Sequence, residues 1–409
     1  MRKTIGFYDE SSSAGGTTRY LATLISGLSR ADFDLVLFAL RPRAWHAEME
    51  SLGVEVVTLF PAPAGSAGPE NSPSRPARRQ VRIPRAIGWW LGLLKETIHL
   101  KRLFAKRRVD LLHSNNAGAE PAPIAARLAG IPVVIATWHV DSTYDLEGIR
   151  SGPRYRLLEM ACMRSLHHAI AVSRATASDW VKRCHLPESY RSRITVIHNG
   201  VDAERLRRRR SVAEAKEAAG LTGRLVVGSM GRLEAAKGYE YLIRALPAVV
   251  KRYPETLLRI AGRGELQTGL TDLARSLGVE KHLEFTGFMG DIRTFLESLD
   301  IYVQPSLCEA LPMAVLEACA VGMPVIASDV GGVAECVLQG KTGFVVPPGQ
   351  PAALGEFIMR PGGDALLREQ MAFAARQTVA EHFRCDVMAG KTADVYRALL
   401  ADKATVRNV

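Results

Sequence analysis

Short apolar segments alternate with helix-length amphipathic segments along this sequence, and several of the apolar segments end in small or polar residues. This alternation is typical of repeated strand–helix units, which build a parallel sheet covered by helices. We therefore predict an α/β fold. In the second half, every strand except the last is followed by a helix-forming segment. The strands are expected at residues 3–8, 34–40, 54–59, 109–113, 132–137, 168–172 and 194–197, and then at 224–230, 256–261, 283–286, 301–304, 324–328 and 344–346.

The length of 409 residues predicts two domains of about 200 residues each, near the upper end of the usual domain size. The alternation restarts after Asn199-Gly200-Val201-Asp202, a sequence with turn chemistry that we place at the hinge. We expect an N-terminal domain over residues 1–198, joined by a C-terminal helix over 382–409, and a C-terminal domain over 199–381. Both are predicted to be Rossmann-like, doubly wound domains that face each other across a cleft.

The composition, with 47% hydrophobic and 23% charged residues, is that of a soluble globular protein. The first apolar run is too short for a signal peptide, and the stretch from Trp89 to Leu94 is far shorter than the roughly 20 residues that span a bilayer. We expect a cytoplasmic protein. No Cys-x-x-Cys pair occurs, which argues against a zinc site or a disulfide framework and indicates reduced, mostly buried thiols. The cysteines are Cys162, Cys184, Cys308, Cys319, Cys336 and Cys385.

The net charge of +11 is concentrated in residues 71–108, which hold eleven basic side chains against one acid, Glu96. This region overlaps residues 61–84, whose Pro, Ala, Ser and Gly content suits a long loop. The rest of the chain is close to neutral, so the charge marks one local surface.

Residues 85–107 are expected to form an amphipathic helix with basic side chains toward its C-terminal end. Such a helix beside a loop suits the surface of an anionic membrane, which favours peripheral attachment. Alternatively, the helix packs on its own sheet and presents a solvated basic face. Nucleic-acid binding is not expected, because no zinc knuckle, recognition-helix pattern or ribonucleoprotein motif is present. The apolar residues at helical spacing are Trp90, Leu93, Leu94, Leu100 and Phe104.

Two glutamates, Glu309 and Glu317, flank the start of a helix that is predicted after the strand at 301–304. Pro312 suits the first turn of that helix, so Glu309 falls in the loop and Glu317 on the second turn. The two carboxylates are then up to about 12 Å apart along the helix axis. Carboxylates accept hydrogen bonds from sugar hydroxyls, and a helix N-terminus favours phosphate. The arrangement suits a nucleotide sugar, although two such glutamates in isolation would only solvate a helix.

A second loop carries two cations, Arg232 and Lys237, in the segment Gly231-Arg232-Leu233-Glu234-Ala235-Ala236-Lys237-Gly238. The segment follows a predicted strand and opens a helix, and ligands bind at the carboxyl ends of parallel strands. Two cations there can neutralise a diphosphate. Arg and Lys beside a helix are usually solvated, so the assignment depends on the glutamate motif as well.

In order and spacing, these motifs resemble those of the retaining glycosyltransferase family 4, whose members have the GT-B architecture. The resemblance spans nearly the whole chain. It implies that Glu309 meets the donor sugar, that Glu317 meets the ribose, and that Arg232 and Lys237 bind the diphosphate. Further matches are Gly15-Gly16, Asn199-Gly200-Val201-Asp202 at the hinge, and Gly331-Gly332 after Asp329.

Four more residues are candidates on the same grounds. Gly15 and Gly16 lie between the first strand and the first helix, where backbone N–H groups can approach an anion or the reacting sugar, although an ordinary tight turn also uses such glycines. His139 stands where family members place a histidine that faces the transferred sugar; a lone histidine is otherwise more often structural. Glu335 is the weaker candidate, because it could be a helix-turn charge only.

Other donor-binding residues are expected at the ends of second-domain strands. Gly262 and the pair Phe288 and Met289 suit the rim of a base pocket, and Leu311, Met313 and Ala314 are expected beside the glutamates. Many relatives have Gly-Phe-Gly where this chain has Ala310-Leu311-Pro312, and proline cannot donate a backbone hydrogen bond. The motif therefore supports sugar transfer without identifying the sugar.

Neither a metal nor another cofactor is expected. The only Asp-x-Asp, Asp32-Phe33-Asp34, precedes a strand instead of following one, so fixed cations and helix dipoles must stabilise the leaving diphosphate. The resemblance implies retention of anomeric configuration, with attack from the leaving-group face and a phosphate oxygen helping to take the proton. The catalytic residues are then Glu309, His139, Arg232 and Lys237.

The sequence thus predicts transfer of a sugar from a UDP- or GDP-sugar to an acceptor. We expect a membrane-associated or lipid-linked glycan in cell-envelope polysaccharide biosynthesis. Other functions remain open at this point: transfer to a soluble small-molecule acceptor, sugar-nucleotide epimerisation on a GT-B-like fold, and non-enzymatic binding of a nucleotide sugar or nucleic acid.

Overall fold

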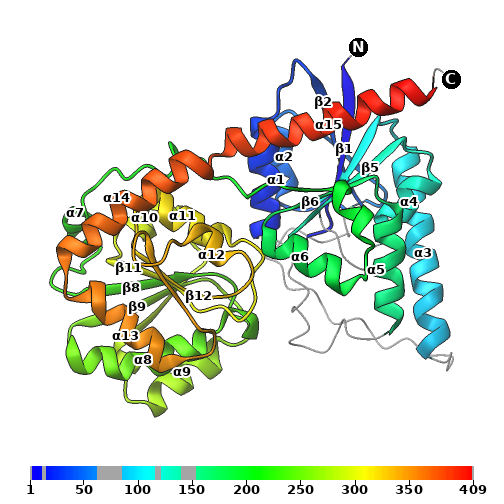
Figure 1. Cartoon of the computed structure of the whole chain (residues 1–409). Coiled ribbons are helices and arrows are strands. Elements are labelled where there is room, and N and C mark those ends of the chain that lie inside the picture. The colour runs from blue at the N-terminus through cyan, green and yellow to red at the C-terminus, as the bar shows by residue number, and fades with distance from the viewer. Residues whose placement is uncertain (1, 12–14, 62–84, 116–120, 140–152, 408–409) are drawn as a thin grey trace.

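The computed structural model describes residues 2–11, 15–61, 85–115, 121–139 and 153–407. They form two α/β domains, each built on a parallel sheet with helices packed against it (Figure 1). The first sheet has seven strands in the order β3-β2-β1-β4-β5-β6-β7, and the second has six in the order β10-β9-β8-β11-β12-β13. The strands are β1 (Lys3–Tyr8), β2 (Phe33–Ala39), β3 (Glu55–Thr58), β4 (Leu111–Ser114), β5 (Val133–Trp138), β6 (His168–Ala171), β7 (Ile194–Val196), β8 (Leu225–Met230), β9 (Thr256–Ala261), β10 (Leu283–Gly287), β11 (Ile301–Gln304), β12 (Val325–Ser328) and β13 (Gly343–Val346).

The predicted α/β fold with two Rossmann-like sheets is confirmed, and the ends of each strand differ from the prediction by at most two residues. In both sheets the strand order reverses beside the first strand, between β1 and β4 and between β8 and β11. In open parallel sheets ligands bind outside the carboxyl ends of the strands at such a reversal. The topology therefore directs attention to the loops after β1, β4, β8 and β11.

The helices connect successive strands and cover the sheets (Figure 1). They are α1 (Gly16–Gly27), α2 (His46–Ser51), α3 (Arg85–Ala105), α4 (Ala122–Leu128), α5 (Pro153–Ser165), α6 (Arg174–Arg183), α7 (Val212–Ala218), α8 (Tyr239–Arg252), α9 (Gln267–Ser276), α10 (Ile292–Glu297), α11 (Met313–Val321), α12 (Val333–Cys336), α13 (Pro351–Gly362), α14 (Ala365–His382) and α15 (Cys385–Arg407).

Two helices were not predicted. The last strand, β13, is followed by α13 and α14, whereas the sequence suggested that no helix directly follows it. Pro351 stands in the first turn of α13, where its missing N–H has no helical partner to lose, and Pro361 falls in the last turn.

The last helix, α15, returns to the N-terminal domain and packs against α1 (Figure 1). It starts at Cys385, three residues later than the predicted 382. Helices α14 and α15 are separate because the backbone between them bonds to Val201. The Val201 N–H donates to the Phe383 carbonyl, and the Cys385 N–H donates to the Val201 carbonyl. The two connections between the domains thus lie side by side at Val201.

The helix predicted over 85–107 is present as α3, but its apolar residues do not form one face. Leu100, Leu103 and Phe104 are buried in the core of the N-terminal domain, and Leu93 packs against it. Trp90 and Leu94 point outward, with 46% and 57% of their surface exposed. Helix α3 therefore packs on its own domain and still presents apolar side chains to the surroundings. The other part of the basic region, residues 71–84, lies outside the described residues, as does most of the predicted loop over 61–84.

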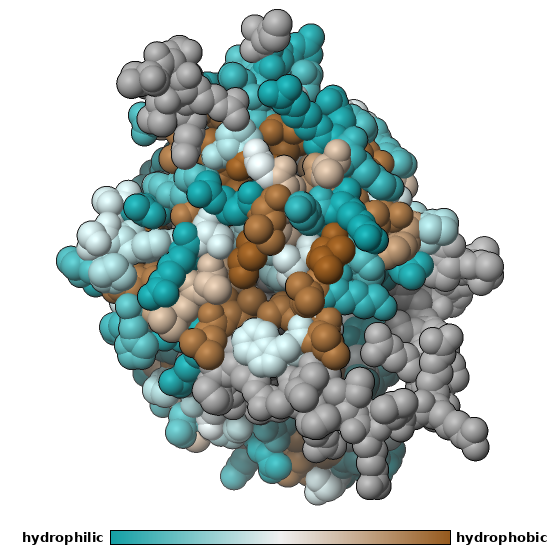
Figure 2. Space-filling model, turned by 90° about the vertical axis from the view of Figure 1, so that its right-hand side faces the viewer, coloured by the Kyte–Doolittle hydropathy of each residue, from teal (hydrophilic) through white to brown (hydrophobic). Residues whose placement is uncertain are grey.

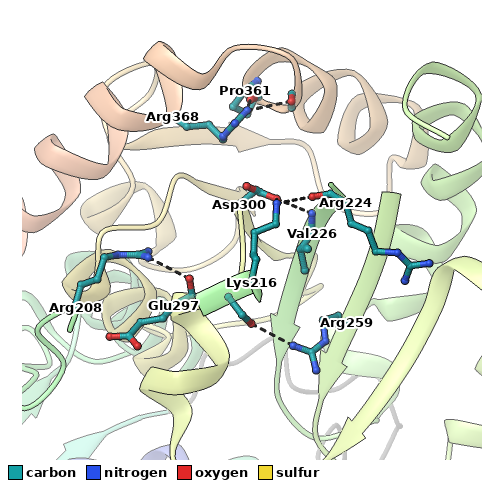
Figure 3. A network of polar contacts seen from close by, with 11 residues as sticks. Arg208, Lys216, Arg224, Val226, Arg259, Glu297, Asp300, Pro361 and Arg368 are labelled. Carbon is teal, nitrogen blue, oxygen red and sulfur yellow. Dashed lines mark hydrogen bonds and ion pairs between the residues drawn. The ribbon is translucent and has the colours of Figure 1, made fainter. Parts of the chain in front are cut away.

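A buried polar network braces the second sheet at the amino ends of its strands (Figure 3). Asp300, directly before β11, accepts hydrogen bonds from Lys216 of α7 at 2.8 Å and from the N–H of Val226 in β8 at 2.7 Å. Nearby, Arg208 donates to the Glu297 carbonyl at 3.1 Å (Figure 3). These contacts hold the amino ends of the strands, whereas the loops after β8 and β11 lie at the carboxyl ends. The network therefore positions the strands from the end opposite the candidate site.

Candidate active site

Glu309 lies in the loop between β11 and α11, as predicted, and three donors converge on one of its oxygens. Lys237 Nζ is 2.8 Å from Glu309 Oε1, Ser306 Oγ is 2.7 Å from it, and Gln304 Nε2 is 3.1 Å from it. The Glu309 side chain is only 10% exposed. The fold thus buries a carboxylate and surrounds it with donors, which is the condition for keeping a charge there.

Lys237, in the loop after β8, reaches across to β11 through this ion pair. Burial opposes the charge on its ammonium group, but the neighbouring Glu309 outweighs that effect, and the pKa of Lys237 is raised. Arg232 lies in the same loop with 65% of its side chain exposed, 3.1 Å from Glu234. The loop therefore offers one half-buried cation held by Glu309 and one cation that is mostly exposed.

Glu317 lies on the second turn of α11, as predicted, and is almost fully buried. Its Oε1 is 2.6 Å from Arg19 Nη1, which comes from α1 of the other domain. Burial raises the pKa of the Glu317 carboxyl, and Arg19 opposes that rise. The structure therefore joins the predicted ribose-binding carboxylate to the N-terminal domain by an ion pair.

The N-terminus of α11 has no side-chain cap. Pro312 occupies the capping position itself, one residue before the first turn in which it was expected, because its backbone is extended. A helix start without a cap leaves backbone N–H groups available to an anionic ligand. These groups lie between Glu309 and Glu317 along the chain.

Leu311, Met313 and Ala314 were predicted to contact the donor. The side chains of Leu311 and Met313 are buried in the core of the C-terminal domain, and Ala314 packs against that core. The Leu311 carbonyl accepts a hydrogen bond from Asn199 Nδ2 at 2.8 Å. These residues can therefore contact a ligand mainly through their backbone atoms.

The glycine pair after Asp329 supports the Glu309 loop. Gly331 has φ = 52°, and a Cβ there would lie 1.6 Å from the Glu309 carbonyl oxygen. The Gly332 N–H donates to the Ala310 carbonyl at 2.7 Å. Gly262, a predicted rim residue, also has a structural reason for being glycine, because a Cβ there would lie 1.8 Å from the Gly231 carbonyl oxygen.

Gly15 and Gly16 differ from those glycines. A Cβ at either position would meet no atom of the described residues within 4 Å, and Gly15 has an extended backbone that any residue adopts. Among the described residues, therefore, neither the space nor the backbone of Gly15 requires a glycine at these positions.

His139 follows β5, and a buried network fixes its ring. Asn115 Nδ2 donates to Asp9 Oδ2 at 2.5 Å and to the Thr17 carbonyl at 3.0 Å, which leaves Asn115 Oδ1 to accept from His139 Nε2 at 3.1 Å. Burial lowers the pKa of His139 to about 3. The imidazole is therefore neutral, and its Nε2 carries the proton.

Glu335 forms contacts with the N-terminal domain, so it is not only a charge on a helix turn. From α12 of the C-terminal domain, its carboxylate accepts hydrogen bonds from the N–H groups of Arg174 and Ala175 at the start of α6, each 3.0 Å long, and lies 2.8 Å from His198 Nε2. Although burial opposes it, these hydrogen bonds lower the pKa of Glu335. Glu335 thus caps a helix of the opposite domain.

The remaining predicted residues lie in the loop after β10. Phe288 is 60% exposed, and Met289 packs partly against the core of the C-terminal domain. An exposed ring at this edge is free to stack on a planar group, which is compatible with the expected base pocket.

Comparisons with known proteins agree with this geometry. Residues 14–205 match the family described as Glycosyltransferase Family 4, and residues 212–378 match the family described as Glycosyl transferases group 1. A glycogen synthase from Mycobacterium tuberculosis is 30% identical over 379 residues, which cover 86% of this chain and 88% of the relative. The chain belongs to glycosyltransferase family 4.

This glycosyltransferase is also similar to a second curated protein and to a solved structure. A UDP-Gal:alpha-D-GlcNAc-diphosphoundecaprenol alpha-1,3-galactosyltransferase from Escherichia coli is 27% identical, over 76% of this chain and 81% of the relative. The structure of HepE from Anabaena in complex with UDP-glucose superposes with a TM-score of 0.77 at 21% identity, covering 97% of this chain and all of HepE. The predicted family and the GT-B fold are confirmed, and the enzyme is a nucleotide-sugar glycosyltransferase of a retaining family.

Within the described residues of this glycosyltransferase, no group of three or more His, Cys, Asp or Glu side chains is arranged to hold a metal ion. The aspartates of the only Asp-x-Asp are both paired with arginines: Asp32 with Arg397 at 2.8 Å, and Asp34 with Arg2 at 3.4 Å. Over the same residues, no helix is long and apolar enough to cross a membrane. All six cysteines are free.

Four residues that contact the candidate site residues were not predicted from the sequence. Arg19 and Asn115 belong to none of the motifs that the sequence analysis identified. Ser306 and Gln304 both bond to Glu309, and their positions three and five residues before it in the sequence could have indicated this contact. Arg19 and Asn115 act on partners 298 and 24 residues away, so only the tertiary fold reveals them.

The buried histidines give a pH prediction. Burial lowers the pKa of both His113 and His139 to about 3, whereas an unfolded chain protonates histidine near pH 6.5. Below pH 6.5 the unfolded state therefore binds more protons than the folded state. As the pH falls further, the free energy of unfolding decreases by about 1.4 kcal/mol per pH unit for each histidine. An NMR titration from pH 8 to pH 5 is expected to show both imidazoles neutral throughout; protonation of either in this range contradicts the assignment.

Proposed function

We propose that this glycosyltransferase uses a UDP- or GDP-sugar and transfers the sugar without a metal ion. The observation that carries the proposal is the largely buried Lys237–Glu309 ion pair beside the N-terminus of α11, which has no side-chain cap. In the resting protein the two side chains neutralise each other. A donor diphosphate offers Lys237 a second anionic partner, and the sugar hydroxyls offer hydrogen bonds to Glu309, whose Oε2 forms no hydrogen bond with the described residues.

The departing diphosphate develops negative charge, and fixed cations stabilise such charge without reorganisation. Lys237, Arg232 and the N–H groups at the start of α11 provide this stabilisation in the proposal. Glu317 holds the ribose, and the exposed ring of Phe288 with Met289 and Gly262 frames the base. Gly15, Gly16 and His139 approach the reacting sugar from the other domain.

His139 does not serve as a strong base in this proposal, because burial lowers its pKa to about 3. Proton transfer is left to the leaving phosphate oxygen, while the acceptor attacks from the same face as the leaving group. His139 instead contributes hydrogen bonding to the sugar, with its ring held by Asn115.

The donor-site assignment predicts that Lys237→Ala and Glu309→Ala each reduce turnover at least a hundredfold, comparable to the loss of one group that stabilises charge in a transition state. Far-UV circular dichroism should remain unchanged. Lys251→Ala and Glu255→Ala, at exposed positions of the same domain, are the matched controls. The assay follows release of UDP or GDP from the sugar nucleotide in the presence of EDTA.

Near-normal turnover in either site variant would contradict the site, and loss of wild-type activity in EDTA would contradict the metal-independent mechanism. Interconversion of sugar nucleotides with no acceptor present would indicate an epimerase. Tight binding of the sugar nucleotide with no turnover would indicate a binding protein.

For the acceptor, we propose a lipid-linked glycan of cell-envelope polysaccharide biosynthesis, reached from the cytoplasmic face of a membrane. Helix α3 supports this. Trp90, Leu94 and Ile98 recur every fourth residue and are 46%, 57% and 41% exposed, so they share one outward stripe. On that stripe Lys101 and Arg102 follow as exposed cations. Figure 2 faces this side of the molecule, and apolar side chains gather near its middle with hydrophilic ones around them.

An exposed apolar stripe that continues into basic residues suits an anionic lipid surface, because lipid accepts the apolar side chains while its headgroups attract the cations. The relative from Escherichia coli is named for an undecaprenol-linked acceptor, which is compatible with this assignment.

Vesicle flotation tests the membrane contact. At low salt, the wild-type protein is expected to float with vesicles that contain anionic lipid, and Leu94→Glu to lose most of that binding, because it places a carboxylate among lipid tails. Leu366→Glu alters an exposed leucine of α14 in the other domain and is the matched control. Absence of wild-type binding to anionic vesicles would refute the contact and favour a soluble acceptor.

A further inference from the structure

The ion pair between Arg19 and Glu317 links the two domains within the proposed donor site. Arg19 Nη1 lies 2.6 Å from Glu317 Oε1. The arginine is the fourth residue of α1, which starts at Gly16, and the glutamate belongs to α11 of the C-terminal domain. Helices α1 and α11 pack against each other at this point. The contact is therefore part of a domain interface as well as of a site.

The two partners are unequally exposed, and this decides which one depends on the other. The Glu317 side chain is 4% exposed, whereas that of Arg19 is 42% exposed. Arg19 can be solvated without Glu317, but a buried carboxylate without a cation is costly. The contact therefore acts mainly on the glutamate, which it holds in one orientation.

Only one carboxylate oxygen is used. Arg19 bonds to Oε1, and Oε2 of Glu317 forms no hydrogen bond with any described residue. An ionised carboxylate is an acceptor only, and its second oxygen has free lone pairs for a hydroxyl donor. Arg19 thus leaves Glu317 able to bind a ribose hydroxyl while fixing the direction from which it does so.

We propose that Arg19 is a positioning residue that completes the ribose subsite from the opposite domain, and that it thereby couples donor binding to contact between the domains. The inference rests on the proposed function, in which Glu317 binds the ribose. Opening the interface removes the partner of Glu317. A ligand that needs the oriented carboxylate therefore binds better when the domains touch, and by linkage its binding favours that contact.

Burial supports the same conclusion. It raises the pKa of Glu317, while Arg19 and, more weakly, Arg205 favour the ionised form. Loss of Arg19 leaves the carboxyl closer to its neutral form, which is a poorer acceptor for hydroxyl groups than the ionised carboxylate.

Isothermal titration calorimetry with UDP and GDP tests the proposal on the full chain. For whichever nucleotide binds more tightly, Arg19→Met is expected to weaken binding about tenfold, within the usual range for coupled sites. Arg19→Lys should restore part of the affinity, because it keeps a cation. Arg2→Met, which removes an exposed arginine of the same domain, is the matched control and should bind as the wild type does.

A double-mutant cycle separates this role from a purely structural one. Glu317→Gln should weaken binding, and Arg19→Met added to it should cause little further loss, because Arg19 acts through Glu317. The 2′,3′-dideoxy form of the same nucleotide, which has no ribose hydroxyls, should bind the wild type and Arg19→Met equally.

Three results would overturn the proposal: unchanged nucleotide affinity in Arg19→Met, fully multiplicative losses in the double variant, or an equal loss of affinity for the dideoxy nucleotide. If the wild type bound neither UDP nor GDP nor their sugars, the proposed function itself would be wrong, and the inference would fall with it.

Discussion

The structure depends on two buried carboxylates of the C-terminal domain, one of which is paired with the N-terminal domain. Glu309 and Glu317 are 10% and 4% exposed, and each is held by a cation: Lys237 from the loop after β8 and Arg19 from α1. Without these partners the carboxylates would destabilise the loop and the helix that carry them. The cations therefore determine where the loop after β11 and the start of α11 can lie, and that placement leaves the helix start open to an anion.

Around these pairs, the interface is made of small, specific contacts. Glu335 of α12 caps α6 of the opposite domain, and Asn199 at the domain connection donates to the Leu311 carbonyl. Gly331 allows its loop to pack against the Glu309 carbonyl. The residues that join the domains thus include close neighbours of those proposed to bind the donor, since Leu311 follows Glu309 by two residues.

Most of the fold could be predicted from the sequence, because apolar segments of strand length are a local signal. The loops with Arg232, Lys237 and Glu309 could be located for the same reason, since parallel strands bring their carboxyl ends to one edge. The errors concern helices: no helix was expected directly after β13, and the apolar residues of α3 suggested one face where the structure has two. The partners of Arg19, Asn115 and Glu335 could not be predicted, because they lie on distant segments and nothing near these three residues in the sequence indicates the pairing.

The most direct test of the account is a crystal structure of the enzyme with UDP or GDP, whichever binds. The account predicts that the diphosphate contacts Lys237, Arg232 and the backbone N–H groups at the start of α11, and that the ribose bonds to Glu317 while Arg19 remains in contact with the same carboxylate. A nucleotide bound away from Lys237 and Glu317 would contradict it.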